Sequence, residues 1–179
     1  FTTTPFSAWD LNSDIQDGLA SIGWEFATQV QTETIPIALS GKDVIGQART
    51  GSGKTAAFGL PTMNACQPNG QLQALILTPT RELANQVAEE LSTLQGNAGL
   101  IIQTVYGGTD LEKQARSLKS GVDIIVGTPG RVMDMTDRGH IDLAKPGFFV
   151  LDEADRMLDM GFFPDIMWVI ERMTSRSQT

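Results

Sequence analysis

The stretch ARTGSGKT, residues 48–55, decides the fold that we expect for this chain. It follows the apolar segment Asp43–Gly46, which we predict to be a strand, and it leads into a helix predicted from Lys54 to about Asn64. A strand, a turn of small residues and a helix N-terminus are the surroundings of a phosphate-binding loop, because glycines let successive backbone N–H groups point at phosphate oxygens. Lys54 adds a positive charge for the outer phosphates, and Thr55 offers a hydroxyl to the Mg²⁺ that accompanies them.

The loop departs from the general phosphate-loop pattern at its first position. Ala48 stands where that pattern has glycine, although a small residue still allows the turn. The alternative interpretation is a glycine-rich turn between strand and helix with an incidental Lys-Thr pair. The loop therefore needs support from other parts of the chain.

The composition excludes several classes of protein. The chain has 179 residues, of which 41% are hydrophobic and 19% charged, as expected for one globular domain with a buried core. No apolar run approaches the ~20 residues of a membrane span, and the first residues do not resemble a signal peptide. The single cysteine, Cys66, allows no internal disulfide, so we expect a cytoplasmic protein, and we expect a monomer. A net charge of −8 argues against binding nucleic acid through bulk charge, so any such binding needs a local patch.

Apolar periodicity predicts an alternation of helices and strands. Helices are predicted at 13–21 and at 28–39, with a break or kink at Pro36. Four buried strands follow at 73–78, 100–105, 123–126 and 148–151, separated by helical segments of about ten residues. This order predicts an α/β fold with a mostly parallel β-sheet and helices on both faces. Ligands of such sheets bind at the carboxyl ends of the strands, where this chain carries its unusual residues.

A second chemical site follows the last predicted strand. Asp152-Glu153-Ala154-Asp155 comes directly after four apolar residues. Asp152 can hold Mg²⁺ through water, and Glu153 can orient and deprotonate an attacking water. The alternative is a solvated acidic turn that caps the next helix. Together with Lys54, these carboxylates suffice for Mg²⁺-dependent hydrolysis of a nucleoside triphosphate.

Several motifs in order resemble one family. The acidic tetrad spells the DEAD box, and Pro79–Ala84, Gly107-Gly108 and Thr128–Arg131 resemble further motifs of the DEAD-box RNA helicases. The loop of that family also begins with Ala, which accounts for Ala48. The resemblance covers essentially the whole chain and implies a RecA-like P-loop domain, the N-terminal lobe of such a helicase. It implies that this lobe binds ATP and Mg²⁺, with Thr55 and Asp152 at the metal and Lys54, Asp152 and Glu153 in catalysis.

The resemblance also implies how adenine is recognised. Residues 23–31 resemble the Q motif of the family, in which the amide of Gln31 reads the N6 donor and the N7 acceptor of adenine. Phe6 falls at the position of an upstream ring that stacks on the base. Alternatively, Gln31 is an ordinary residue of a helix surface and Phe6 anchors the N-terminus in the core. We expect ATP to be preferred over GTP. The residues assigned to the nucleotide are Phe6, Gln31, Ala48, Arg49, Thr50, Gly51, Ser52, Gly53, Lys54 and Thr55.

The turns after the other strands are implied to contact RNA. Hydroxyls, arginines and glycines in such turns read the backbone and its 2′-hydroxyls rather than base edges, so we expect little sequence specificity. Alternatively, Arg81 forms an internal salt bridge to Glu82 or Asp155, and the two glycines only make a tight turn. The residues assigned to RNA are Pro79, Thr80, Arg81, Gly107, Gly108, Thr128, Pro129, Gly130 and Arg131.

The resemblance also sets the expected domain organisation. We expect residues 1–179 to form a single RecA-like ATP-binding lobe, with the Q-motif region at 1–40 and the core at 41–179. A second RecA-like lobe, absent from this sequence, supplies the arginines that complete the phosphate site. The two-lobed protein is expected to couple ATP hydrolysis to local unwinding of RNA. Alternatives are a nucleotide-gated RNA clamp without unwinding, and a P-loop ATPase that acts on DNA. Met157, Met160 and the pair Phe162-Phe163 are expected to pack in the core or against the last helix. Alternatively, the two phenylalanines form an exposed patch that faces a partner.

Overall fold

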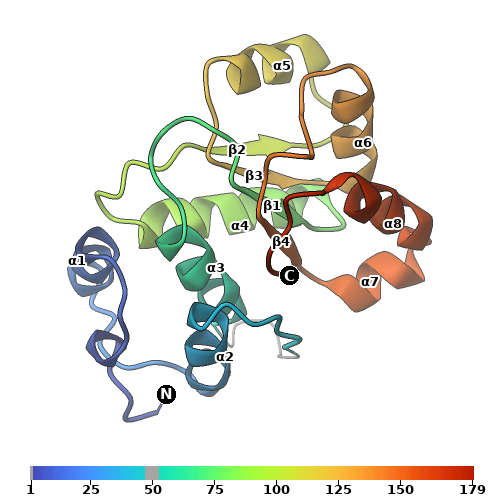
Figure 1. The fold of residues 1–179 in the computed structure, drawn as a ribbon. Helices are drawn as coiled ribbons and strands as arrows, with labels where there is room; N and C mark the ends of the chain where they lie inside the picture. Colours follow the sequence, from blue (N-terminus) through green and yellow to red (C-terminus); the bar gives the residue numbers. More distant parts are fainter. Residues whose placement is uncertain (1, 47–52) are drawn as a thin grey trace. The chain divides into compact units, whose positions relative to one another are not determined.

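The computed structural model describes residues 2–46 and 53–179 (Figure 1). The chain divides into two compact units. The first unit comprises Phe1–Gln67 and Glu89–Leu100, and the second comprises Pro68–Ala88 and Ile101–Thr179. Residues 47–52, which include Ala48, Arg49, Thr50, Gly51 and Ser52 of the predicted phosphate loop, lie outside the described residues.

The second unit is built on a parallel β-sheet. Its described strands are β1 (Ala74–Leu77), β2 (Ile102–Val105), β3 (Ile124–Gly127) and β4 (Phe148–Leu151), in the order β2-β3-β1-β4. All pairings between neighbouring strands are parallel. The predicted α/β class with a parallel sheet is therefore confirmed.

The two central strands are buried along their whole length. Every residue of β1 and β3 is inaccessible to solvent, which accounts for their continuous apolar sequences, Ala-Leu-Ile-Leu and Ile-Ile-Val-Gly. In the register, Leu77 lies opposite both Gly127 and Leu151, and Val105 also lies opposite Gly127. The four strands thus end at the same level, and the turns that follow them meet at one edge of the sheet.

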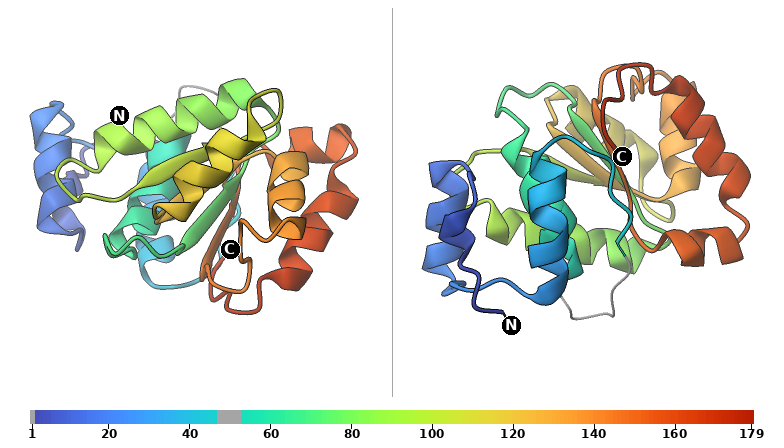
Figure 2. Two further views of the ribbon diagram at one scale, coloured as in Figure 1. Left: turned by 90° about the horizontal axis from the view of Figure 1, so that it is seen from above. Right: turned by 60° about the horizontal axis from the view of Figure 1, so that its bottom comes forward.

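Four helices of the second unit share a hydrophobic core with the strands. They are α5 (Leu111–Lys119), α6 (Pro129–Asp137), α7 (Ala154–Asp159) and α8 (Phe163–Arg172). Figure 2 shows α5, α6 and α8 alongside the strands. Their buried apolar residues pack with side chains of β1, β3 and β4, and each fully buried Val, Leu, Ile or Met side chain contributes roughly 1.5–3 kcal/mol. These residues are Ala115, Leu118, Val132, Met135, Met157, Ile166 and Val169.

The prediction that the apolar side chains after the DEAD box pack in the core or against the last helix is confirmed only in part. Met157 is buried and Phe162 packs partly against the core, but Met160 and Phe163 are exposed. Gly161, with φ of 83°, ends α7 and redirects the chain into α8. Met160 and Phe163 flank this surface turn, so the prediction that they are buried was wrong.

The first unit is helical. It contains a short 3₁₀ helix at Phe6–Ala8, α1 (Ser13–Ser21), α2 (Gln29–Leu39) and α3 (Lys54–Asn64), while α4 (Arg81–Leu94) begins in the second unit and ends in the first. The bounds of α1 and α3 agree with the prediction. Helix α2 continues through Pro36 to Leu39, so the sequence does not break the helix there.

The strand predicted at Asp43–Gly46 was wrong. These residues belong to no strand, and Ile45 is 98% exposed. Only two adjacent residues, Val44 and Ile45, are strongly apolar, and such a short run does not bury enough surface to define a strand without pairing to a neighbour. In the described part of the chain, no helix has the length and apolar character needed to cross a bilayer.

Candidate nucleic-acid interface and nucleotide site

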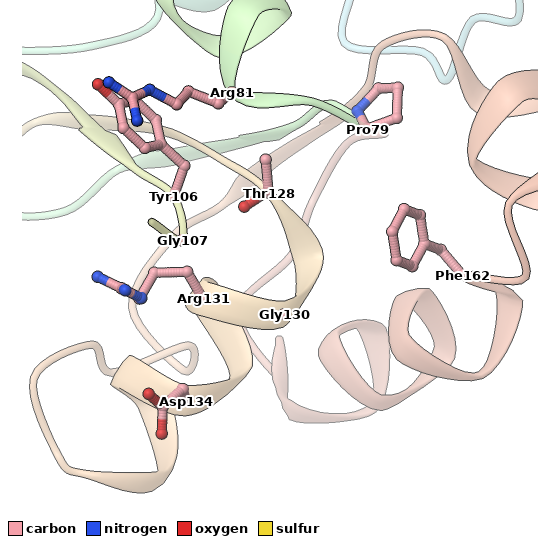
Figure 3. A pocket seen from close by; sticks show the side chains of 9 residues that line it. All are labelled: Pro79, Arg81, Tyr106, Gly107, Thr128, Gly130, Arg131, Asp134 and Phe162. Carbon is pink, nitrogen blue, oxygen red and sulfur yellow. The ribbon is translucent and has the colours of Figure 1, made fainter. Parts of the chain in front are cut away.

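A pocket of about 470 Å³ opens at the carboxyl edge of the sheet in the second unit (Figure 3). The turns after β1, β2 and β3 each contribute to it, together with the start of α6 and the residue before α8. Of the residues predicted to contact RNA, six line this pocket, and Thr80, Gly108 and Pro129 do not. The lining residues are Pro79, Arg81, Tyr106, Gly107, Thr128, Gly130, Arg131, Asp134 and Phe162.

Arg81 is held at the pocket by an aromatic ring. It is the first residue of α4, and its guanidinium carbon lies 5.1 Å from the centre of the Tyr106 ring. Figure 3 shows the two side chains next to each other. Such a cation–π contact orients the guanidinium without neutralising it. Among the described residues, no carboxylate pairs with Arg81, which disfavours the internal salt bridge to Glu82 or Asp155. The charge of Arg81 is therefore available to an anion.

Arg131 is held by neutral acceptors. Its Nη1 donates to Oε1 of Gln114 at 3.0 Å, and its Nη2 donates to the carbonyl oxygen of Thr109 at 3.2 Å. Gln114 lies on α5, and Thr109 follows the paired glycines. The side chain is thus fixed by two elements while it keeps its full positive charge.

The N-terminus of α6 adds backbone donors to the same pocket. Thr128 is the N-cap residue in an extended conformation, and its side chain makes no capping hydrogen bond. Pro129 occupies the first turn, where its missing N–H costs nothing. The first N–H groups of a helix lack intrahelical partners and carry a partial positive charge. The Thr128 hydroxyl and this helix terminus together suit a phosphate oxygen.

One carboxylate also lines the pocket. Asp134 lies on α6, one turn after Arg131, and its Oδ1 accepts from Nε of Arg138 at 3.0 Å. This hydrogen bond and the charge of Asp134 raise the pKa of the Arg138 guanidinium. Because Arg138 offsets the carboxylate, Asp134 repels an incoming phosphate less than an unpaired aspartate would.

The DEAD box lies at the end of β4. Asp152 is only 4% exposed, and its N–H donates to the carbonyl of Leu77 at 2.9 Å. This burial disagrees with a solvated acidic turn. Glu153 is the N-cap residue of α7 but makes no capping hydrogen bond through its side chain. With φ of 58° and ψ of 46°, it is the one non-glycine residue in the left-handed region among the described residues.

That backbone conformation of Glu153 is informative. For a residue with a side chain it costs about 1–3 kcal/mol, and such costs concentrate at functional sites. The carboxylate of Asp152 is a hard oxygen donor of the kind that Mg²⁺ prefers. The residues at the end of β4 therefore fit a magnesium and water site.

In the first unit, Gln31 connects the Q motif to the end of the phosphate loop. Its side chain is 1% exposed, its Oε1 accepts from the N–H of Thr28 at 2.9 Å, and its Nε2 donates to the carbonyl of Gly53 at 3.1 Å. Gln31 is thus not an ordinary residue of a helix surface. Gly53 has φ of 86° and precedes Lys54 and Thr55, the first residues of α3. A Cβ on Gly53 would collide with the Gln31 amide and lie 2.9 Å from Oγ1 of Thr28.

Phe6 is buried in an aromatic cluster. Its side chain is 2% exposed, stacks on Trp24 with a centroid distance of 6.0 Å, and meets the ring of Trp9 edge-on at 5.7 Å. Its N–H donates to the carbonyl of Glu25 at 3.0 Å. This arrangement favours the second interpretation of Phe6, that of an anchor for the N-terminus.

Four residues at the pocket or directly beside it were not predicted to belong to a binding site, namely Tyr106, Gln114, Asp134 and Phe162. Tyr106 directly precedes the paired glycines. An aromatic side chain at the end of a strand, beside such a turn, is a signal from which a binding role could have been predicted. Gln114 gave no signal, because its role depends on the position of Arg131, 17 residues further along the chain.

Comparison with known proteins identifies the class to which this fold and these turns belong. A family model described as DEAD/DEAH box helicase matches residues 28–179. The chain therefore belongs to the DEAD/DEAH box helicase family, as the motifs had indicated.

Particular relatives cover nearly the whole chain. RNA helicase CrhR of Synechocystis sp. is 50% identical over 177 residues, which are 99% of this chain and 36% of that protein. The DEAD-box ATP-dependent RNA helicase CshA of Bacillus subtilis is 46% identical over 178 residues, again 99% of this chain and 36% of the relative. The chain thus spans about a third of the length of these relatives.

Solved structures show the same fold. A DEAD box protein from Methanococcus jannaschii superimposes with a TM-score of 0.92 at 40% identity, over 97% of this chain and 48% of that one. A hypothetical ATP-dependent RNA helicase from Sulfolobus tokodaii superimposes with a TM-score of 0.87 at 37% identity, over 94% of this chain and 49% of that one. The chain therefore has the RecA-like fold that the motifs implied, as the solved DEAD-box protein does over 97% of this chain.

Proposed function

We propose that this chain binds ATP with Mg²⁺ and the backbone of single-stranded RNA, and that the two-lobed protein couples ATP hydrolysis to local unwinding of an RNA duplex. In this proposal residues 1–179 form one RecA-like lobe, with residues 1–40 as the Q-motif region. The observation that carries it is the pocket at the carboxyl edge of the sheet, where two arginines are held by neutral groups beside a helix N-terminus.

The RNA contacts follow from the chemistry of the pocket. Arg81 and Arg131 pair with phosphate oxygens, and the Thr128 hydroxyl and the first N–H groups of α6 donate to a neighbouring phosphate. Gly107 and Gly130 have no side chain to keep the strand at a distance, and a Cβ at either would meet no atom within 4 Å. These groups recognise the backbone and not the base edges, so we expect affinity for many sequences.

The adenine contact rests on the amide of Gln31. An amide group has two N–H donors and two acceptor lone pairs. Thr28 and Gly53 occupy one acceptor site and one donor site, so the amide retains one of each for the N7 and N6 positions of adenine. This capacity supports a preference for ATP over GTP, which a competition binding assay with the two nucleotides measures.

Hydrolysis is assigned to the side chains of Lys54, Asp152 and Glu153, and Thr55 is assigned to the metal. Lys54, at the start of α3, would place its charge at the outer phosphates, and Thr55 and Asp152 are the residues that would hold Mg²⁺. Bound Mg²⁺ would neutralise charge that develops on the phosphate oxygens. Glu153 orients the attacking water and accepts its proton, a role that suits a carboxylate fixed in a strained backbone conformation.

We further propose that the activity requires a second RecA-like lobe. The curated relatives are about three times as long as this chain, and in such enzymes an arginine from another element completes the phosphate site. Loss of that arginine lowers rates by roughly 10³–10⁵. This chain alone should therefore bind nucleotide and show little RNA-stimulated hydrolysis. We place the protein in the cytoplasm, in line with its single cysteine. We also propose that it is a monomer.

The Glu153→Gln variant of the full-length protein tests the assignment. It removes the proton acceptor but keeps size and polarity, so ATP hydrolysis should fall by roughly 10²–10⁴ while ATP affinity stays within a few-fold of wild type. Steady-state hydrolysis and nucleotide binding measure the two effects. The exposed Glu112→Gln on α5 is the matched control and should hydrolyse ATP at the wild-type rate.

Two outcomes would favour other functions. If the Glu153→Gln variant still supports the function of the protein in the cell, the nucleotide-gated RNA clamp replaces the helicase. If single-stranded DNA stimulates hydrolysis as strongly as RNA of the same sequence does, the protein is an ATPase without preference for RNA.

A further inference from the structure

Gln114 connects three parts of the pocket by hydrogen bonds. Its Nε2 donates to the carbonyl oxygen of Tyr106 at 3.2 Å and to Oγ1 of Thr109, and its Oε1 accepts from Nη1 of Arg131 at 3.0 Å. Thr109 in turn donates from Oγ1 to the carbonyl of Tyr106 at 3.1 Å, and its own carbonyl accepts from Arg131. From its place on α5, Gln114 thus connects the residues on both sides of the paired-glycine turn to Arg131 on α6.

The orientation of the Gln114 amide is fixed by this network. Both N–H groups of Nε2 have acceptors, and Oε1 has a donor. Turning the amide over would place an NH₂ group against the guanidinium of Arg131, donor against donor, and would leave the Tyr106 carbonyl facing an oxygen. The side chain therefore holds Arg131 and the turn in one defined arrangement.

The chemistry of an amide is required at this position. A carboxylate of the same shape would also accept from Arg131, but it would neutralise the guanidinium and could not donate to Tyr106. An apolar side chain of similar size would leave Arg131 charged but without its fixed position. Only a neutral group with donors and an acceptor orients the arginine and leaves its charge for a phosphate.

We propose that Gln114 is a positioning residue for RNA binding, which acts by presenting a fixed and un-neutralised Arg131 together with the paired-glycine turn to a phosphate of the RNA. This inference rests on the proposed function of the pocket and names a residue that the sequence motifs did not include. Gln114 itself does not line the pocket, and it makes no contact with the RNA in this proposal.

The test measures binding of a short oligouridylate by the full-length protein with wild-type, Gln114→Met and Gln114→Glu sequences. Both variants should weaken binding roughly tenfold, because Gln114→Met releases Arg131 from its fixed position and Gln114→Glu neutralises its charge. The slope of log K against log salt should become shallower by about 0.7 for Gln114→Glu, which neutralises one phosphate contact. The matched control is Arg116→Gln, which makes the same change in net charge at an exposed position on the same helix and should bind like wild type.

A double-mutant cycle distinguishes positioning from a general effect on the fold. In the Arg131→Gln background, Gln114→Met should lose most of its effect, since the group that Gln114 orients is gone. Thermal melting identifies a variant that fails to fold; should Gln114→Met melt early, the near-isosteric Gln114→Glu carries the cycle. Equal losses of affinity in both backgrounds, or binding by Gln114→Met at wild-type strength, would overturn the inference. Failure of the wild-type protein to bind the RNA would instead refute the proposed function, and the inference with it.

Discussion

At the scale of single residues, each unit has a candidate site residue whose backbone conformation most side chains avoid. Glu153 adopts a left-handed conformation at the end of the DEAD box, and Gly53 adopts one at the end of the phosphate loop. At Gly53 two demands coincide, because the Gln31 amide also approaches the position that a Cβ would fill. The glycine therefore permits both the turn and the contact to the Q motif.

The Gly53→Ala variant tests this double requirement. It should destabilise the protein by about 1–3 kcal/mol and weaken ATP binding, since the new Cβ displaces Gln31. The matched control is Gly139→Ala, where φ is 81° but a Cβ would meet no atom within 4 Å. Denaturant unfolding should show a smaller loss for the control, and its nucleotide affinity should not change. Equal effects in the two variants would argue against the Gln31 contact.

Residue roles were predictable from the sequence where a motif fixes both residue type and spacing. Gln31 was singled out in this way, and the structure gives it a buried amide with partners in two motifs. The interpretation of Phe6 was less secure, because the sequence cannot show that Trp9 and Trp24 enclose its ring. Long-range contacts of this kind depend on tertiary packing and leave no local pattern.

At the scale of elements, the close fit between β3 and α6 sets the position of the pocket that we propose for RNA. Gly127 ends β3, and a Cβ there would lie 2.6 Å from Cγ2 of Val132 on α6 and 2.8 Å from the carbonyl oxygen of Val105. This contact leaves no room for any larger residue. Because Thr128 and Arg131 belong to the start of α6, the packing at Gly127 also determines where these groups lie.

Two glycine variants separate packing from binding at this helix. Gly127→Ala should lower stability by about 1–3 kcal/mol through overpacking, and it should weaken RNA binding by shifting α6. In Gly130→Ala the new Cβ meets no atom within 4 Å and the residue lies in the helix, so the stability of this variant should equal or exceed that of wild type. Its RNA affinity should fall, because the methyl group obstructs the approach of the RNA backbone. Thermal melting and RNA titration of both variants measure this. Unchanged RNA affinity in Gly130→Ala would show that the N-terminus of α6 does not contact the RNA.

Elements were predictable where periodicity and boundary residues agree. The bounds of α1, α3 and β4 match the predicted ones, because Gly23 follows α1, a glycine precedes Lys54, and acidic residues follow four apolar ones. The failure at Asp43–Gly46 has a physical cause, since a strand is defined by its pairing partner as much as by its own residues. The short helix α7 was not predicted, because it has a single buried residue, Met157.

At the scale of the whole molecule, a protein of net charge −8 is proposed to bind a polyanion. The structure offers a local explanation in the second unit. Its pocket holds two arginines without carboxylate partners among the described residues, and its one aspartate is paired with Arg138. Local charge and oriented donors therefore outweigh the unfavourable total, because charges beyond a Debye length of about 8 Å are screened at physiological salt.

The most direct test of this account is the salt dependence of single-stranded RNA binding by the full-length protein and its Arg81→Gln and Arg131→Gln variants. If both arginines contact phosphates, each variant should bind more weakly, with a slope of log K against log salt shallower by about 0.7, for RNA of any sequence. Arg116→Gln, which removes an exposed arginine of α5 that does not line the pocket, is the control and should keep the wild-type slope. Wild-type affinity and slope in both pocket variants would contradict the account, because the RNA would then bind elsewhere.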